Sequence, residues 1–174
     1  SHSMILYGED RITPAKKTAM ALVEYIQRNY QKDTIDVILF GDEAEEVPLD
    51  KLTEIKVGPY HTNTKAGLQL AQRLLMRRKA ANRQVFMITD GKPSAITESG
   101  QIYKNPFGLD PKIVNQTITE ATQLRRKGIT ITTFMITTDP YLQDFVDKLT
   151  RANKGRAYFS TLDNLGSFIF ADYG

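Results

Sequence analysis

The sequence contains no cysteine, which excludes disulfides, thiolate metal sites and a cysteine nucleophile. No apolar run approaches the roughly 20 residues of a transmembrane helix, and no signal peptide is evident. These absences predict a chain without a membrane segment and fit the reducing conditions of the cytoplasm. The phosphate-binding fingerprints GxxxxGK[ST] and GxGxxG are also missing. The chain is therefore not expected to hydrolyse ATP itself or to bind a dinucleotide.

What is present has the balance of a soluble globular domain. Of 174 residues, 41% are apolar and 25% are charged, which predicts a single domain spanning residues 1–174 with one substantial core. The net charge of +3 is mild. Two basic clusters, at residues 77–79 and 125–127, fall in the last turns of predicted helices, where the helix dipole stabilises cations. No aromatic residues alternate with them, so nucleic acid is not an expected partner.

Helical periodicity alternates with short β-branched and apolar runs along the chain. This alternation predicts an α/β fold with a doubly wound, mostly parallel sheet flanked by helices on both faces. The acidic strand that follows a Gly-Asp turn predicts a hairpin at one edge of the sheet. Helices are expected at 14–30, 64–79, 110–127, 139–154 and 163–170, and strands at 34–40, 44–48, 84–89, 129–136 and 157–160.

Two segments depart from this pattern. Residues 91–109 form a long stretch without periodicity, which we interpret as a functional loop at the carboxyl end of a strand or as a disordered insertion. No apolar strand is recognised before the first helix. Ser1 stands where such a strand is expected to end, so the first central strand is predicted to be missing from the chain.

Oxygen-bearing side chains stand in three separate loops. Ser1 and Ser3 lie in the first, Thr62 in the second and Asp90 in the third, the Thr89-Asp90-Gly91 turn. Hydroxyl and carboxylate oxygens suit a magnesium-like cation, which takes about six oxygen ligands at roughly 2.1 Å. Taken singly, the serines and the threonine also fit ordinary turn and helix caps. Together, these four residues are the predicted metal ligands.

The order Ser-x-Ser-Met, Thr-x-Thr and Thr-Asp-Gly resembles a von Willebrand factor A (VWA) domain. Such domains carry a metal-ion-dependent adhesion site formed by Asp-x-Ser-x-Ser, a distant threonine and a distant aspartate. The resemblance implies that Ser1 and Ser3 match the two serines, Thr62 the threonine and Asp90 the second aspartate. The ion is expected to be Mg²⁺, with Mn²⁺ or Ca²⁺ as alternatives.

Further segments resemble bacterial VWA proteins associated with MoxR-type AAA+ ATPases. The resemblance implies an accessory role beside such an ATPase or its client. The segments that carry it are Ile88-Thr89-Asp90-Gly91-Lys92-Pro93, Thr133-Phe134-Met135-Ile136 and Asn153-Lys154-Gly155-Arg156-Ala157.

The family's first aspartate has no counterpart before Ser1, which predicts a domain truncated at its N-terminus and a weakened metal site. An alternative origin for the first four residues is a cloning remnant, and in that case only Thr62 and Asp90 remain as candidate ligands. His2 and His61 both adjoin proposed ligands. They are expected to line the rim of the site or face solvent, and zinc binding by the two imidazoles is the alternative.

The resemblance implies a non-enzymatic protein-binding module. In VWA domains the cation keeps one open position, which an aspartate or glutamate of a partner protein fills. With so little protein charge at the site, the incoming carboxylate supplies much of the attraction. Two alternatives remain open, a metal-assisted phosphoryl or ester hydrolase on the same scaffold and a metal-free interaction domain.

Overall fold

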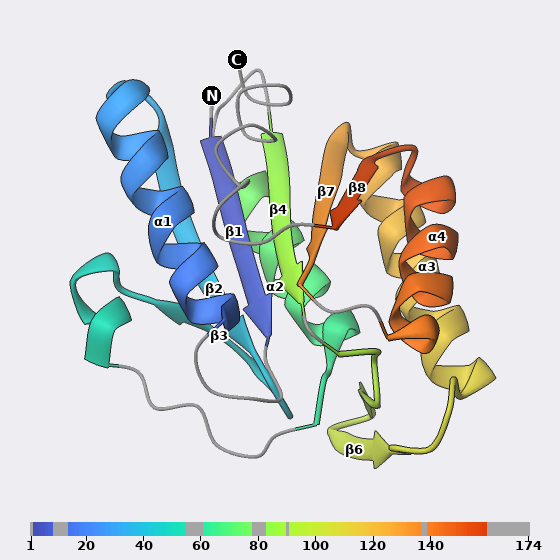
Figure 1. Cartoon of the computed structure of the whole chain (residues 1–174). Coiled ribbons are helices and arrows are strands. Elements are labelled where there is room, and N and C mark those ends of the chain that lie inside the picture. Colours follow the sequence, from blue (N-terminus) through green and yellow to red (C-terminus); the bar gives the residue numbers. More distant parts are fainter. Residues whose placement is uncertain are drawn as a thin grey trace.

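A six-stranded sheet forms the centre of the molecule (Figure 1). The computed structural model describes residues 2–8, 14–54, 61–77, 83–89, 91–136 and 139–159. In sheet order the strands are β3 (Ala44–Val47), β2 (Thr34–Phe40), β1 (His2–Gly8), β4 (Arg83–Thr89), β7 (Ile129–Met135) and β8 (Arg156–Phe159). All neighbouring pairs are parallel except β2 and β3, which form the predicted edge hairpin. The predicted α/β class with a mostly parallel sheet is confirmed.

Strand β1 is the central strand that was expected to be missing. It lies between β2 and β4, with His2 opposite Thr34 and Arg83 at one end and Gly8 opposite Thr89 at the other. The expectation of a missing strand was therefore wrong, because residues 2–8 form this strand and not a loop after it. Ile5, fully buried at its centre, contributes to the core.

The two ends of the parallel strands define two edges of the sheet. The carboxyl edge is where β1, β2, β4 and β7 end, at Gly8, Phe40, Thr89 and Met135. The amino edge is the opposite one, where these strands begin. A seven-residue strand separates the edges by roughly 20 Å, at about 3.3 Å per residue. Which edge a residue lies on therefore decides whether it can join a common site.

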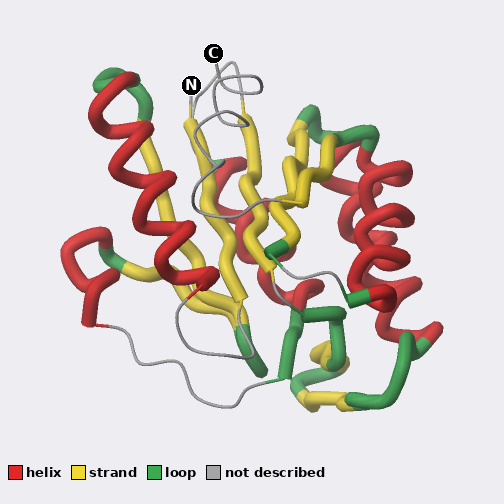
Figure 2. Tube along the Cα trace, in the orientation of Figure 1, coloured by secondary structure: helices red, strands yellow, loops and turns green. Residues whose placement is uncertain are grey.

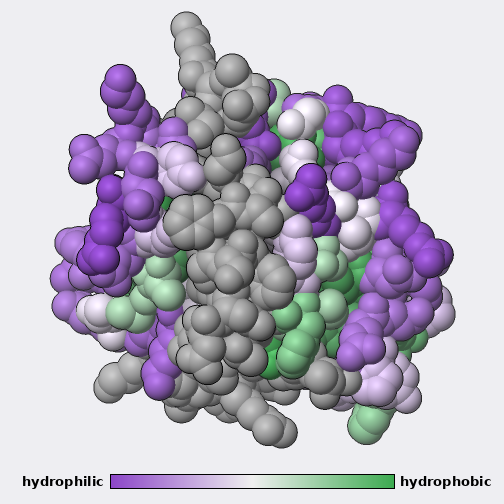
Figure 3. Space-filling view, turned by 45° about the horizontal axis from the view of Figure 1, so that its top comes forward, coloured by the Kyte–Doolittle hydropathy of each residue, from purple (hydrophilic) through white to green (hydrophobic). Residues whose placement is uncertain are grey.

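Helices cover both faces of the sheet (Figures 1 and 2). Helix α1 (Pro14–Asn29) lies on one face, where Leu22 and Ile26 pack with Phe86 and Phe134 of the strands. The other face is covered by α2 (Thr64–Met76), α3 (Pro111–Arg126) and α4 (Pro140–Asn153), which share a second apolar cluster. The sides of the molecule formed by α1 and α4 are hydrophilic on the outside (Figure 3). A short 3₁₀ helix, η1 (Leu49–Glu54), follows β3.

The helices begin where their capping residues predict. Asp110 and Asp139 each accept a hydrogen bond from a first-turn amide and precede a proline at the first helical position. The predicted helix at 163–170 lies outside the described residues. Among the described helices, none is both long enough and apolar enough to span a membrane.

The segment at 91–109 contains a β-hairpin. Strands β5 (Ala95–Glu98) and β6 (Gln101–Lys104) pair antiparallel around Ser99 and Gly100, which have φ angles of 48° and 79°. Two consecutive positive φ angles match the twist of a tight hairpin. The expectation of a stretch without regular structure was therefore wrong, since four-residue strands are too short to produce a clear period of two.

Candidate metal centre at the carboxyl edge

The structure separates the predicted ligands. Thr62 lies in the loop that precedes α2, beside the carboxyl edge. Ser3 belongs to β1, where it is paired with Ile35 and Gln84 near the amino edge. The expectation that Ser3 lies in a loop beside Thr62 is therefore not met, because nearly the whole of β1 separates Ser3 from the carboxyl edge. Ser1 and Asp90 lie outside the described residues.

A set of short hydrogen bonds fixes Thr62. Its amide donates to Ser94 Oγ at 2.9 Å, and its carbonyl accepts from the amides of Ser94 and Ala95 at 2.9 and 3.2 Å. Thr62 is only 6% exposed, yet none of the hydrogen bonds between described residues uses its Oγ1. The backbone of Thr62 is therefore held in place while its hydroxyl stays available to a ligand.

Asn63 connects three segments beside Thr62. Its Oδ1 accepts from the amide of Ala66 at 3.0 Å and so caps α2, and its Nδ2 donates to the carbonyl of Asp42 and to Thr97 Oγ1, each at 3.0 Å. The side chain is completely buried. Because buried amide groups are costly to leave unpaired, Asn63 fixes α2 relative to β2 and the hairpin.

The end of β4 brings the third loop to Thr62. Thr89 Oγ1 donates to the carbonyl of Gly91 at 2.9 Å and accepts from its amide at 3.3 Å, which holds Gly91 close to the end of β4. A Cβ atom placed on Gly91 would lie 3.5 Å from Thr62 Oγ1. The Thr62 hydroxyl is therefore adjacent to the residue that follows Asp90.

A third carboxyl-edge side chain, Asp42, is already paired. Its Oδ1 accepts from the His61 amide at 2.9 Å and lies 3.4 Å from His61 Nδ1, while its Oδ2 lies 3.6 Å from Lys104 Nζ. His61 is one-third exposed and directly precedes Thr62. His2 lies at the start of β1 on the amino edge, so the structure does not bring the two histidines together as zinc ligands.

The hairpin is fastened to the helices around the site. Lys112 Nζ lies 2.6 Å from Glu98 Oε1, and Gln116 donates to Glu98 at 3.2 Å. These two partners, Lys112 first, lower the pKa of Glu98. Tyr103 donates to Asp110 Oδ2 at 2.6 Å, and with Asn105 and two α3 amides it lowers the pKa of Asp110 to about 2. The hairpin is thus a fixed part of the carboxyl edge.

Some of the oxygen atoms in this region suit a hard cation. Thr62 Oγ1 is a hard oxygen without a hydrogen bond to any described residue, and Asp90 is covalently between Thr89 and Gly91. Over the ranges that the structure describes, no group of three or more His, Asp or Glu side chains could hold a metal. Asp90, the fourth predicted ligand together with Ser1, Ser3 and Thr62, lies outside those ranges.

Three residues of this region were not assigned a role from the sequence. Ser94 and Asn63 position Thr62, and Thr89 holds Gly91. An asparagine directly before a helical run is a capping signal, so Asn63 could have been found. Ser94 could not, since its bond to Thr62 joins residues 32 positions apart.

Comparison with known proteins shows the family and the fold of the chain. The family model described as "Rv0959-like protein, vWA domain" matches residues 1–174. The protein Rv0959 of Mycobacterium tuberculosis is 32% identical over 179 residues, which cover 99% of this chain and 26% of that protein. The chain thus spans about a quarter of the length of the curated relatives it matches.

Solved structures share the fold at low sequence identity. The vWF domain of the type V pili tip protein Mfa5 from Porphyromonas gingivalis has a TM-score of 0.72 at 13% identity, covering 98% of this chain and 93% of that one. Proximal thread matrix protein 1 from the mussel byssus, described with a zinc-occupied MIDAS motif, has a TM-score of 0.66 at 15% identity, covering 98% and 44%.

Proposed function

Because the chain belongs to the family of Rv0959-like vWA domains, we propose that it is a metal-ion-dependent protein-binding module. One observation carries the proposal most directly. The hydroxyl of Thr62 is held by its backbone at the carboxyl edge, next to Gly91, and makes no hydrogen bond to a described residue. A side chain placed in this way beside Asp90 suits a cation ligand.

The ligand set proposed here is Thr62 and Asp90, completed by oxygens from the segment that follows β1. In sequence order this segment is Glu9-Asp10-Arg11-Ile12-Thr13, and it takes the place after the first strand where VWA domains carry Asp-x-Ser-x-Ser. It departs from that pattern but offers two carboxylates and a hydroxyl. Ser1 and Ser3 are replaced in the set because β1 places Ser3 near the other edge.

The proposed ion is Mg²⁺, with Mn²⁺ or Ca²⁺ as substitutes. When bound, it would offer an electrophilic position to an aspartate or glutamate of a partner protein. The chain's own residues keep the site in shape. Ser94 holds the Thr62 backbone, Asn63 holds α2, and Thr89 holds Gly91. The proposed role is binding and not catalysis.

For the partner, we retain the class implied by the sequence resemblance. A MoxR-type AAA+ ATPase or its client is the proposed partner, and the cytoplasm the proposed compartment. Support comes from the motif segments around Asp90 and Asn153 and from the absence of cysteine. Since the chain spans about a quarter of its curated relatives, this proposal concerns the domain within a longer protein.

Calorimetric titration with MgCl₂ and MnCl₂ tests the proposed site. Thr62→Val keeps the β-branched shape and removes the hydroxyl, and Asp90→Ala removes the carboxylate. Each is expected to weaken metal binding about tenfold or more without unfolding the domain. Ser3→Ala is the matched control, and its affinity should equal that of the wild type.

Two results would contradict the proposal. Equal affinity in wild type and Thr62→Val would show that this hydroxyl is not a ligand. Loss of binding in Ser3→Ala as well as in Thr62→Val and Asp90→Ala would restore the first ligand set. Metal-dependent hydrolysis of p-nitrophenyl phosphate or p-nitrophenyl acetate that is lost in Asp90→Ala would instead support the hydrolase alternative.

A further inference from the structure

Lys92 links two segments that carry exposed aromatic side chains on the carboxyl edge. Lys92 follows β4, Phe107 lies between β6 and α3, and Tyr141 lies in the first turn of α4. Lys92 Nζ donates to the carbonyl of Pro106 at 2.9 Å and lies 5.9 Å from the centre of the Tyr141 ring. Lys92 therefore connects the loop of Phe107 to Tyr141, and we call these three side chains the aromatic–lysine patch.

Phe107 is 84% exposed, and Tyr141 is 53% exposed. Among the described residues, Phe107 is the most exposed large hydrophobic side chain. Aromatic side chains dominate the binding energy of many interfaces, and their exposure in a free protein leaves apolar area in contact with water. The patch thus has the composition of a binding surface.

The turn that presents Phe107 is fixed. The amide of Phe107 donates to Asn105 Oδ1 at 3.0 Å, Asn105 Nδ2 donates to Asp110 Oδ2 at 2.9 Å, and the amide of Asn105 donates to the carbonyl of Ser94 at 2.9 Å. Gly108 follows with a φ of 60°, which a residue with a side chain seldom adopts. A partner that binds a turn held in this way pays little ordering entropy.

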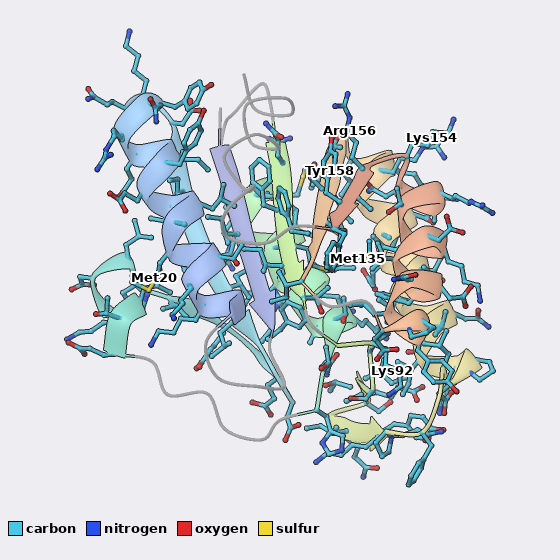
Figure 4. The ribbon with its side chains drawn as sticks, in the orientation of Figure 1. Met20, Lys92, Met135, Lys154, Arg156 and Tyr158 are labelled. Carbon is cyan, nitrogen blue, oxygen red and sulfur yellow. The ribbon has the colours of Figure 1, made fainter. Side chains whose placement is uncertain are left out.

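The patch adjoins the proposed metal centre. Lys92 directly follows Gly91, where an added Cβ would lie 3.5 Å from Thr62 Oγ1, and it stands two residues after Asp90. In Figure 4, Lys92 lies at the end of the sheet opposite to Lys154 and Arg156. A partner segment that places a carboxylate at the cation would therefore bring its neighbouring side chains onto the patch.

The charged side chains of the carboxyl edge favour an acidic partner. Within the described ranges, no carboxylate forms an ion pair with Lys92. Nearby carboxylates of the described residues have other partners: Asp42 pairs with Lys104 and His61, Glu98 with Lys112, and Asp110 with Tyr103 and Asn105, while Asp139 accepts from the Tyr141 amide. The patch thus offers one ammonium group and two aromatic rings.

We infer that the aromatic–lysine patch binds an acidic linear segment of a partner protein that carries a large apolar side chain next to its carboxylates. The apolar side chain packs on Phe107 and Tyr141, and a carboxylate approaches Lys92. The inference rests on the proposed function in one respect: another carboxylate of the same partner segment binds the cation. It adds the sequence character of the partner, which the metal centre alone does not specify.

A phage library of random linear peptides, selected on the domain in MgCl₂ and eluted with acid, tests the inference. The enriched peptides should share an Asp or Glu beside an aromatic or aliphatic residue. A synthetic peptide of the consensus should bind Phe107→Ser and Tyr141→Ser about tenfold more weakly than wild type. Lys92→Gln should weaken binding and reduce its dependence on salt.

Met76→Ser is the matched control, because Met76 is 43% exposed at the far end of α2. It should bind the peptide as wild type does, and thermal unfolding should confirm that all variants remain folded. Equal binding by Phe107→Ser and wild type would overturn the inference, as would the absence of any enriched sequence. A change in oligomeric state in Phe107→Ser without an effect on the peptide would identify a second copy of the chain as the occupant and also overturn it.

Addition of EDTA separates this inference from the proposed function. Peptide binding that depends on Phe107 but persists in EDTA would contradict the metal-dependent function and support the patch. Binding that is abolished by EDTA but is unaffected in all three patch variants would contradict the patch and leave the metal centre intact.

Discussion

At the scale of single residues, Asn153 connects two helices to strand β7. Its Oδ1 accepts from the Ile131 amide at 2.8 Å, and its Nδ2 donates to the carbonyls of Ala121 and Ile129 at 3.1 and 3.2 Å. Strand β8 pairs with β7 from Thr132 onward. Asn153 makes hydrogen bonds to the backbone of β7 before that point, at Ile129 and Ile131. This gives a structural reason for the Asn-Lys-Gly motif, which the sequence had linked only to a protein family.

Asn153→Ala should therefore destabilise the domain strongly. It removes three hydrogen bonds and leaves buried backbone groups of Ile131 and Ile129 unpaired, at a cost of about 2 to 4 kcal/mol in unfolding free energy. Urea unfolding followed by circular dichroism measures this loss. Asn115→Ala, an exposed asparagine on α3, is the control and should change the free energy by less than about 0.5 kcal/mol. Similar effects of the two substitutions would refute the structural role of Asn153.

At the scale of elements, Asp110 couples the β5–β6 hairpin to the start of α3. The hydrogen bond from Tyr103 contributes most to the lowered pKa of Asp110, followed by the bond from Asn105, while burial opposes both. A carboxyl group whose pKa is lower in the folded state stabilises the fold above its unfolded pKa. That contribution is lost as the pH falls from about 4 towards 2.

Asp110→Asn retains a capping oxygen but cannot ionise, so the variant should be less stable than wild type at neutral pH. Its stability should also change less with pH between about 4 and 2, because one titrating carboxyl group is removed. Melting temperatures measured across this range check both expectations. Asp144→Asn on α4, whose partner Lys148 is exposed, is the control. An unchanged acid dependence in Asp110→Asn would contradict the coupling.

The sequence predicted most elements but not the central strand. Strands β4 and β7 are recognisable because β4 contains the continuous apolar run from Val85 to Ile88 and β7 is rich in β-branched residues, as expected for strands covered on both faces. Strand β1 begins with His2 and Ser3, and only the run from Met4 to Tyr7 is apolar. That run, ended by Gly8, is a strand signal, but Ser-x-Ser was interpreted as a metal-binding loop. The hairpin was missed because its strands are short.

At the scale of the whole molecule, the β1 register decides which residues can form one site. The sequence predicted that the Thr62 loop and the Thr89-Asp90-Gly91 turn lie together, and Gly91 does lie beside Thr62, since each loop adjoins a recognisable element. The position of Ser3 was not predicted, since it depends on the pairing of Ser3 in β1 with Ile35 in β2 and Gln84 in β4, which are 32 and 81 residues away in sequence. Local patterns reveal elements, whereas the edge on which a short polar motif lies depends on long-range register.

The central claim is that the cation binds at the carboxyl edge. Manganese titration of the ¹⁵N-labelled domain, followed by paramagnetic broadening of amide signals, locates the ion most directly. We predict that the amides of Thr62, Ala66 and Gly91 broaden first, while those of Ser3 and Gln84 at the amino edge stay sharp. Broadening centred on Ser3, or uniform broadening without a preferred edge, would contradict the account.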